Sequence, residues 1–311
     1  ANVQGRGSEW ERPVHITFFE ADGTLAFAQD AGIRLFGSST RGLAQKSFRI
    51  TARKEEYFAI GRDAGRAGKA AAVLLAGGQG TRLGSDAPKG TYDIGLTRPL
   101  YIFEQLVRNL QEVTSACGAS IPLLIMTSEK NDCETREFFE KHDCFGYPRE
   151  DIFFFRQAMA PCMDLEGKIL LEDKGRIALS PNGNGGWYSS LVKAGLAEAM
   201  AARGVEWYNV FAVDNVLQRI CDPVFLGATI ASGKASGAKV VRKAEPHERV
   251  GVLCLEDGLP SVVEYYELSE EMANLRGADG NLVYSFGVIL NYLFRADTLK
   301  AIADKRLPLH C

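Results

Sequence analysis

The run of seven apolar residues at 70–76, followed at once by glycines, constrains the fold of this chain more than any other stretch. The run has no polar alternation, which is typical of a strand buried on both faces of a parallel sheet. Gly77 and Gly78 end the run, and glycines allow backbone N–H groups to come close to a ligand. Because Arg82 and Lys89 follow, the pattern predicts a polyphosphate-binding turn at the carboxyl edge of an α/β sheet.

Two common glycine loops do not fit this turn. A P-loop has its lysine directly after a glycine, whereas Lys89 precedes Gly90. A dinucleotide-binding loop needs Gly-x-Gly-x-x-Gly, but Gly78, Gly80 and Gly84 have one residue too many between the last two glycines. The residues themselves leave open a phosphate-binding turn of another kind and a glycine turn that binds nothing.

Strand and helix patterns alternate along most of the chain. Apolar spacing predicts helices at 55–68, 100–113 and 187–202, and strands at 122–127, 152–156 and 207–213. Asn131 or Asp132 is expected to cap a further helical segment, and 169–179 to form a hairpin. This βαβ alternation implies a mostly parallel, doubly wound sheet with its binding groups at the carboxyl edge.

The first 54 residues have a pattern of their own. The stretch from His15 to Leu25 resembles a phosphatase strand that delivers Asp-x-Asp-Gly-Thr, but Glu20 stands at the position of the nucleophile. Asp22-Gly23 between apolar stretches is also typical of a hairpin turn, and about fifty residues are too few for a phosphatase core. We therefore expect a hairpin in this segment.

Composition and charge exclude several classes of protein. The 311 residues, 46% of them hydrophobic, suit a soluble globular protein with a large core. A net charge of −3 argues against broad nucleic-acid binding, so local groups must attract any anionic ligand. Cys133, His142 and Cys144 lack an evident fourth metal ligand, and reduced cysteines point to a cytoplasmic protein. No apolar run reaches the ~20 residues that a membrane helix needs.

Four groups of motifs follow one another along the chain. They are Leu75-Ala76-Gly77-Gly78-Gln79-Gly80-Thr81-Arg82-Leu83-Gly84 with Pro88-Lys89-Gly90, Ser180-Pro181-Asn182-Gly183-Asn184-Gly185-Gly186, Val213-Asp214-Asn215 and Val263-Glu264-Tyr265. In this order they resemble the UTP-dependent sugar-1-phosphate uridylyltransferases, and most closely the UDP-N-acetylglucosamine pyrophosphorylase-like branch. The resemblance covers roughly residues 55–311. It implies a glycosyltransferase-A-like nucleotidyltransferase fold, a Rossmann-like doubly wound mixed sheet with a sugar-binding lobe.

The resemblance also implies the residues that bind the nucleotide. These are Leu75, Ala76, Gly77, Gly78, Gln157, Gly183 and Asp214. Gln157 follows the strand at 152–156, and in the family a glutamine here reads uracil, since a side-chain amide offers both a donor and an acceptor. Asp214 ends a buried strand, where a carboxylate opposite a triphosphate is a natural Mg²⁺ ligand. The alternative roles of Asp214 are a cap for the helix that Pro223 begins and an ordinary turn aspartate.

The sugar-binding residues implied by the resemblance are Asn184, Gly251, Glu264 and Tyr265. Glu264 is expected to accept hydrogen bonds from sugar hydroxyls. Where N-acetylglucosamine-directed members commonly have Gly-Asn, this chain has Gly287-Val288. An amide contact to the sugar is therefore absent unless Asn291 supplies one, which leaves specificity for the acetamido group open.

The predicted activity is transfer of UMP from UTP to a hexose-1-phosphate, either N-acetylglucosamine-1-phosphate or glucose-1-phosphate, giving UDP-sugar and pyrophosphate. Arg82 and Lys89 are the expected catalytic residues, because positioning and charge neutralisation drive an in-line transfer that needs no protein nucleophile. Mg²⁺ is the expected cofactor, and neither nucleic acid nor membrane is an expected partner. The alternatives are a non-catalytic nucleotide-sugar-binding relative and, disfavoured by the loop spacing, a dinucleotide-dependent oxidoreductase.

The expected organisation is an atypical N-terminal segment at 1–54 followed by a nucleotidyltransferase catalytic domain at 55–311. The resemblance implies that the C-terminal part of that domain is missing. It also implies that a lysine in a Lys-Lys-containing segment lies beyond Cys311 and reaches the phosphates from the side opposite the glycine turn. We therefore expect the chain to bind nucleotide better than it catalyses.

Overall fold

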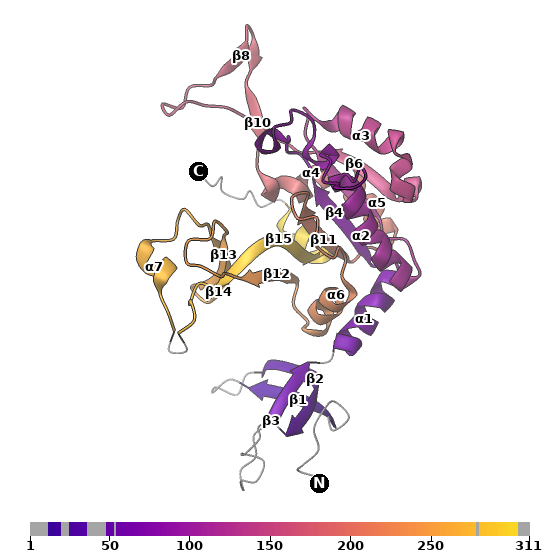
Figure 1. The fold of residues 1–311 in the computed structure, drawn as a ribbon, viewed down its shortest axis with the longest axis vertical. Helices are drawn as coiled ribbons and strands as arrows, with labels where there is room; N and C mark the ends of the chain where they lie inside the picture. The colour runs from indigo at the N-terminus through magenta and orange to yellow at the C-terminus, as the bar shows by residue number, and fades with distance from the viewer. Residues whose placement is uncertain (1–11, 20–24, 36–47, 53, 278–279, 304–311) are drawn as a thin grey trace. The chain divides into compact units, whose positions relative to one another are not determined.

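The computed structural model describes residues 12–19, 25–35, 48–52, 54–277 and 280–303 (Figure 1). The chain divides into two compact units, one made of residues 1–63 with 222–234 and the other of 64–221 with 235–311. No helix within the described ranges is long and apolar enough to span a membrane. The separation of a segment 1–54 from a catalytic domain 55–311 stays a prediction.

The first unit contains a three-stranded antiparallel sheet, most of one helix and the whole of another. Its elements are β1 (Arg12–Phe19), β2 (Leu25–Leu35), β3 (Phe48–Ala52), α1 (Lys54–Arg66) and α6 (Pro223–Ala231). β1 pairs antiparallel with β2, as expected for a hairpin, while Glu20 and Asp22-Gly23 lie outside the described residues. α1 and α6 approach closely, because a Cβ on Gly61 would overlap the backbone of Pro223.

The second unit contains an eight-stranded sheet with the order β14-β13-β15-β11-β4-β5-β6, and β12 also pairs with β15. Its strands are β4 (Ala70–Leu75), β5 (Leu123–Thr127), β6 (Ile152–Arg156), β11 (Trp207–Ala212), β12 (Ser236–Arg242), β13 (Val252–Glu256), β14 (Leu259–Val263) and β15 (Phe286–Arg295). β4, β5, β6 and β11 are parallel, whereas β12 to β15 join through antiparallel pairs. The predicted doubly wound mixed sheet is confirmed.

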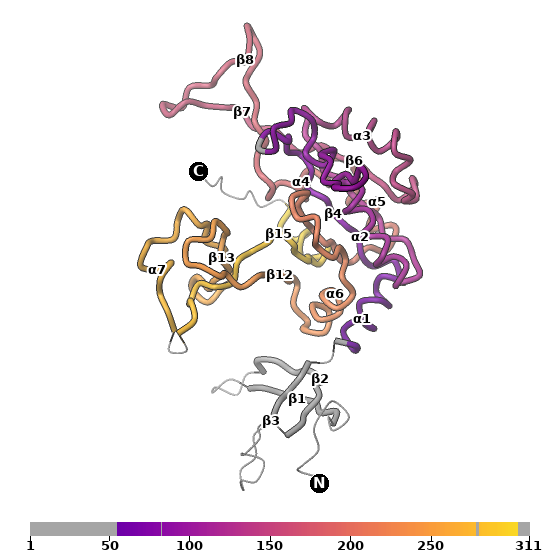
Figure 2. Tube along the Cα trace, in the orientation of Figure 1, coloured from indigo at the N-terminus to yellow at the C-terminus, as the bar shows by residue number. Residues whose placement is uncertain are grey.

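The helices and remaining short strands of this unit cover and extend the sheet. They are α2 (Ile102–Cys117), α3 (Asp132–Lys141), α4 (Trp187–Lys193), α5 (Leu196–Ala202), α7 (Glu270–Asn274), α8 (Ala296–Ile302), β7 (Met159–Pro161), β8 (Leu171–Asp173), β9 (Arg176–Ile177) and β10 (Leu179–Pro181). Single 3-10 turns are η3 (Thr81–Leu83), η4 (Lys89–Thr91), η5 (Asp143–Gly146), η6 (Arg149–Asp151) and η7 (Asn184–Gly186). The segment from β7 to β10 forms a hairpin arm, which Figure 2 traces through β7 and β8.

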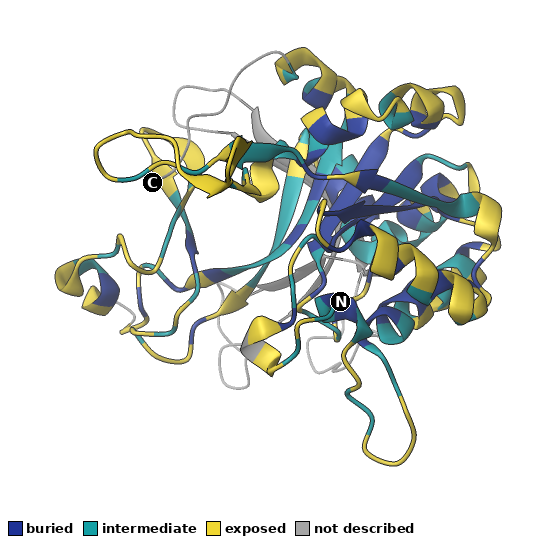
Figure 3. Cartoon of the chain, turned by 90° about the horizontal axis from the view of Figure 1, so that it is seen from above, coloured by how far each residue is buried: buried dark blue, intermediate teal, exposed yellow. Residues whose placement is uncertain are grey.

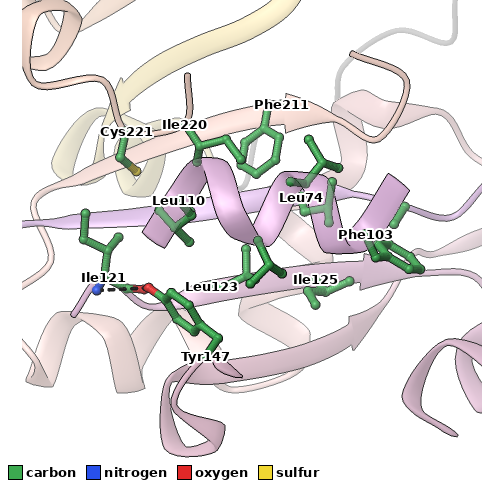
Figure 4. Close-up of a cluster of buried hydrophobic side chains, with 14 of the residues drawn as sticks. Leu74, Phe103, Leu110, Ile121, Leu123, Ile125, Tyr147, Phe211, Ile220 and Cys221 are labelled. Carbon is green, nitrogen blue, oxygen red and sulfur yellow. Dashed lines mark hydrogen bonds between the residues drawn. The ribbon is translucent and has the colours of Figure 1, made fainter. Parts of the chain in front are cut away.

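Alternate residues of β4 pack into two separate cores. Ala72 and Leu74 join the cluster beneath α2 and α3, where Figure 4 shows Leu74 beside Phe103 of α2. Ala71 and Val73 join the cluster with α4 and α5 on the other face. Figure 3 shows the central strands as buried, with exposed residues on the outer sides of the helices. The unbroken apolar run is therefore explained, because both faces of β4 are covered.

Two local predictions differ from the structure. The helix predicted at 187–202 is two helices, because Gly195 adopts a left-handed backbone with φ of 72° and ends the first. Asn131 does occupy the cap position of α3, but its side chain makes no capping hydrogen bond. Asp257-Gly258 joins the paired strands β13 and β14.

The order of the strands fixes where a ligand can bind. From β4 the chain moves outward through β5 and β6, and then returns to place β11 on the other side of β4. Successive crossovers on opposite sides of β4 make its border with β11 a topological switch point, and α/β sheets bind ligands at the carboxyl ends of the strands there. Gly77 follows β4 and Asp214 follows β11 at this edge.

Candidate functional site

The glycine turn after β4 presents three successive backbone N–H groups. Within the described residues, no hydrogen-bond acceptor is found for the N–H groups of Gly77, Gly78 or Gln79. Gly78 is exposed, and its two neighbours are half-buried. Unpaired backbone donors at such an edge are suited to oxygen atoms of a base or a phosphate. Leu75 and Ala76, which precede them, are buried in the sheet.

The chain folds back on this turn and returns Lys89 to it. The N–H of Gly80 donates to the carbonyl of Ala87 at 2.9 Å, and the N–H of Lys89 donates to the carbonyl of Gly78 at 3.3 Å. A Cβ on Gly78 would lie 3.9 Å from Nζ of Lys89. The ammonium is therefore close to the exposed glycine. Arg82 lies in η3, within the segment that folds back. The structure does not describe the position of its side chain.

Lys89 and Asp214 meet across the switch point. Nζ of Lys89 lies 2.7 Å from Oδ1 of Asp214, and the two side chains are 21% and 64% exposed. The predicted phosphate ligand and the predicted metal ligand are thus adjacent. The cap of α6 is a different residue, Asp222, whose carboxylate accepts a hydrogen bond from the N–H of Val224. The alternative role of Asp214 as that cap is therefore wrong.

Gln157 spans two loops of the site. Its side chain is buried, and Nε2 donates to the carbonyl of Gly183 at 2.9 Å. A Cβ added to Gly77 would lie 2.6 Å from Oε1 of Gln157, so glycine is required for this close approach. Gln157 therefore joins the glycine turn to the second predicted loop and is not a solvated loop residue. Asn184 begins η7 directly after Gly183 and is exposed.

The predicted sugar contacts form a second group, on β13 to β15. A Cβ on Gly251 would lie 3.2 Å from Oε2 of Glu264, and the carbonyl of Gly251 accepts a hydrogen bond from the N–H of Val288 at 2.8 Å. Burial raises the pKa of Tyr292, and the negative charge of Glu264 adds to the rise. Tyr265 follows Glu264 and is exposed. Val288 therefore does lie beside the predicted sugar residues.

Asn291 does not replace the missing amide contact to a sugar. Its side chain is buried, donates to Oε1 of Gln218 at 3.1 Å and accepts from Nδ2 of Asn209 at 2.9 Å. Gln218 in turn donates to the carbonyl of Ala212 at the end of β11. This amide cluster, Asn209, Gln218 and Asn291, holds the loop that follows Asp214. Sequence reasoning missed its role, although a polar residue inside an apolar strand was the signal.

The cysteines and the histidine that were weighed as a metal site have other surroundings. Cys144 is buried and Cys133 is exposed. His142 packs against Phe138 and Phe145 with ring centroids 4.4 and 5.4 Å away. Across the described part of the chain, no group of three or more His, Cys, Asp and Glu residues is arranged to hold a metal ion.

Comparison with known proteins agrees with this geometry. The family model of UTP–glucose-1-phosphate uridylyltransferase matches residues 50–296. The UDP-N-acetylhexosamine pyrophosphorylase-like protein 1 of Homo sapiens is 42% identical over 247 residues, covering 78% of this chain and 49% of that protein. The UDP-N-acetylglucosamine pyrophosphorylase of Saccharomyces cerevisiae is 40% identical over 266 residues, covering 83% and 56%. The chain thus spans about half the length of these relatives.

Solved structures give the same result for the fold. The uridine diphosphate N-acetylglucosamine pyrophosphorylase of Trypanosoma brucei, solved with an inhibitor, superposes with a TM-score of 0.74 at 34% identity, covering 81% of this chain and 52% of that one. UDP-glucose pyrophosphorylase of Leishmania major, at 18% identity and a TM-score of 0.62 over 76% of this chain and 52% of its own, shares the fold. From the motifs, the sheet and the family match together, this chain belongs to the UTP–glucose-1-phosphate uridylyltransferase family.

Proposed function

We propose that this chain binds UTP and a sugar-1-phosphate and exchanges them for UDP-sugar and pyrophosphate. The observation that carries the proposal is the meeting of Lys89 and Asp214 at the switch point, beside three N–H groups that have no acceptor among the described residues. Such a group offers a cation and backbone donors to a triphosphate and a carboxylate to its counter-ion. The names of the relatives support uridine nucleotides and sugar phosphates as the substrate class.

The reaction requires charge neutralisation and alignment at the α-phosphorus. A phosphate oxygen of the sugar-1-phosphate attacks that atom, a new P–O bond forms, and the bond to pyrophosphate breaks with its electron pair going to the leaving group. The attacking phosphate is already ionised at neutral pH, so no general base is needed. Lys89 neutralises charge on the leaving side, and Arg82 is proposed to share this task.

Asp214 fits Mg²⁺ even though it is a single carboxylate. Mg²⁺ retains several waters and commonly takes one or two protein carboxylates together with phosphate oxygens of the substrate. The carboxylate is 64% exposed and follows the buried strand β11, so it can reach an ion held by the triphosphate. The ion would add positive charge beside the phosphates, while Asp214 orients it.

The ion pair of Lys89 and Asp214 couples binding of the nucleotide to binding of the metal ion. Without ligand, each side chain neutralises the other across 2.7 Å. A bound triphosphate would take over the ammonium of Lys89, and Asp214 would then be available to hold Mg²⁺, which would supply positive charge beside the phosphates. Binding both together exchanges one exposed ion pair for two charge-assisted contacts, which favours the nucleotide–metal complex over either component alone.

Base and sugar recognition are assigned to separate groups of residues. Gln157, fixed between Gly77 and Gly183, is proposed to read uracil together with the glycine-turn backbone. Glu264 beside Gly251 is proposed to accept hydrogen bonds from sugar hydroxyls, with Asn184 and Tyr265 as further contacts. Val288 presents an apolar side chain next to this group, so we propose weak discrimination between acetamido and hydroxyl sugars.

The test is pyrophosphate release from UTP and a panel of glucose-, galactose- and N-acetylglucosamine-1-phosphates, with and without Mg²⁺. The proposal expects release that depends on UTP and Mg²⁺ and is at least ~100-fold lower in Asp214→Ala. Lys174→Ala, which alters an exposed lysine of the hairpin arm, is the matched control and should retain full activity. Binding of UDP-sugar without any pyrophosphate release would assign the chain a binding role instead.

Val288→Asn tests the sugar part of the proposal separately. An amide at this position would add a donor and an acceptor beside Gly251, and one good polar contact is worth about 10-fold in discrimination. The ratio of activity with N-acetylglucosamine-1-phosphate to that with glucose-1-phosphate should rise by about this factor. An unchanged ratio would show that the sugar does not reach Val288.

A further inference from the structure

Asn131, on the loop between β5 and α3, holds the glycine turn from behind. Its side chain is 0% exposed. Nδ2 donates to the carbonyl of Ala76 at 2.9 Å and to the carbonyl of Gly78 at 3.3 Å, while Oδ1 accepts from the N–H of Ser128 at 2.7 Å. The two carbonyls that flank Gly77 are thus tied to one amide group.

These hydrogen bonds set the direction of the unpaired donors. In a planar trans peptide the C=O and N–H groups point in opposite directions. Holding the carbonyl of Ala76 toward Asn131 therefore turns the N–H of Gly77 away from it, and holding the carbonyl of Gly78 does the same for the N–H of Gln79. These N–H groups are among those that lack an acceptor in the described structure.

Asp132, the next residue, holds the other side of the base site. Its carboxylate is 4% exposed and accepts hydrogen bonds from Thr127 at 2.6 Å, from Arg136 at 3.0 Å and from Arg156 at 3.0 and 2.9 Å. Arg156 directly precedes Gln157, whose own N–H donates to the carbonyl of Thr127. Asp132 therefore holds Thr127 at the end of β5 and Arg156 at the end of β6. These two residues position the backbone of Gln157.

The network is more than a way to satisfy a buried charge. A buried carboxylate needs partners, but one arginine and the threonine would already supply them. Arg136 comes from the same helix as Asp132, whereas Arg156 reaches it from β6 and is 61% exposed. Because Arg156 reaches Asp132 from the neighbouring strand and directly precedes Gln157, its two hydrogen bonds to Oδ2 of Asp132 also restrain the backbone that presents Gln157.

We infer that Asn131 and Asp132 are positioning residues for base recognition, Asn131 aiming the N–H groups of the glycine turn and Asp132 fixing Arg156 so that Gln157 stands against Gly77. This inference rests on the proposed function, because it concerns the same nucleotide site. It adds that discrimination between uracil and cytosine depends on two side chains that need not touch the nucleotide.

The test compares the affinities of the full chain for UTP and CTP by calorimetry. Asn131→Ala should reduce the ratio of the two affinities by about 10-fold, because two donors that orient the turn are lost. Arg156→Lys, which keeps the charge but loses the bidentate contact, should reduce the ratio by about 3-fold. Lys89→Ala should weaken UTP and CTP equally and leave the ratio unchanged, since it acts on the phosphates.

The control separates positioning from stability. Gln111→Ala removes an amide of α2 that donates to the carbonyl of Phe145, away from the glycine turn. It should change thermal stability but not the affinity ratio. If Asn131→Ala fails to fold, Arg156→Lys still tests the inference, because it alters an exposed residue.

Two results would overturn the inference, and they differ from each other. An unchanged ratio in folded Asn131→Ala and Arg156→Lys, with a clear UTP preference in the unaltered chain, overturns the positioning roles alone. Equal affinities of the unaltered chain for UTP and CTP overturn the proposed uracil site, and the positioning roles with it.

Discussion

Nζ of Lys89 and Oδ1 of Asp214 lie 2.7 Å apart, although the two residues are separated by 125 positions in the sequence. Lys89 arrives there because the chain folds back along the glycine turn, and Asp214 because β11 lies beside β4. Exposed pairs of this kind stabilise a fold by ~1 kcal/mol at most. The contact therefore contributes little to stability, and its main consequence is that a cation and a carboxylate lie side by side.

Lys89→Ala should reduce affinity for UTP by about 10- to 100-fold, because a charge-assisted hydrogen bond to phosphate is lost. Affinity for uridine, which has no phosphate, should barely change. Calorimetry with both ligands measures the two effects, and thermal unfolding should show little loss of stability. An equal loss for uridine and UTP would contradict a phosphate contact.

Gly77→Ala should displace the Gln157 side chain, because the added Cβ would lie 2.6 Å from its Oε1. The expected result is roughly 10-fold weaker UTP binding, with a smaller preference over CTP. Gln157→Ala supplies the matched comparison. In the double variant the Gly77→Ala change should cost almost nothing further, since the colliding amide is gone. Additive losses would mean that the alanine acts on the turn itself.

Asp132 should make the fold sensitive to acid. Burial alone would raise the pKa of its carboxyl, but hydrogen bonds from Thr127, Arg136 and Arg156 more than offset this and hold the pKa below the ordinary value of an aspartate. A carboxylate whose pKa is lowered in the folded state stabilises the fold above the unfolded pKa, and this contribution is lost as the pH falls through the lowered value. The stability difference between the unaltered chain and Asp132→Asn should follow this course.

Urea unfolding at several pH values measures that difference. It should be constant between about pH 6 and pH 8 and shrink only in strong acid. Glu166, an exposed carboxylate of the hairpin arm, provides the control through Glu166→Gln. A difference that disappears already near pH 6 would contradict the lowered pKa.

Asn291→Ala should destabilise the fold by about 2 kcal/mol, because Oε1 of the buried Gln218 loses the donor that it has in the structure and Nδ2 of Asn209 loses one of its two acceptors. Turnover should also fall, since the amide cluster holds the loop that follows Asp214. Thermal unfolding measures the first effect and pyrophosphate release the second. Asn274→Ala on α7, an exposed position, is the control and should change stability by less than ~0.5 kcal/mol.

The central sheet was predictable because its strands are buried on both faces. The apolar runs at 70–76 and 207–213 need two covering layers, and short βαβ connections then determine parallel order. The same logic placed Gly77 and Asp214 at one edge. The structure places Gln157 in a buried position between two loops, whereas its role in reading the base stays a prediction.

Partners distant in the sequence could not be predicted from local pattern. Asn131 looks like a helix cap because of its position before α3, yet its donors go to a carbonyl 55 residues earlier. Asn291 was considered for a sugar contact because of its place in the motif, and its neighbours on β11 and the following loop became evident only in the folded sheet. A side-chain amide forms hydrogen bonds with groups that lie near it in the folded protein. The periodicity of the sequence does not predict which groups these are.

β11 has a different kind of neighbour on each side, parallel β4 on one and antiparallel β15 on the other. Gly77, Gln157 and Asp214, which are proposed to bind the nucleotide, follow parallel strands, while Gly251 directly precedes β13 and Val288 lies in β15. For protein engineering, β11 thus separates a module to be kept from one that can be exchanged. From the proposed sugar site we expect substitutions on β13 to β15 to alter sugar preference, provided that the residue register between β11 and β15 is preserved, because a shift of one residue would turn every side chain of β15 to the opposite face.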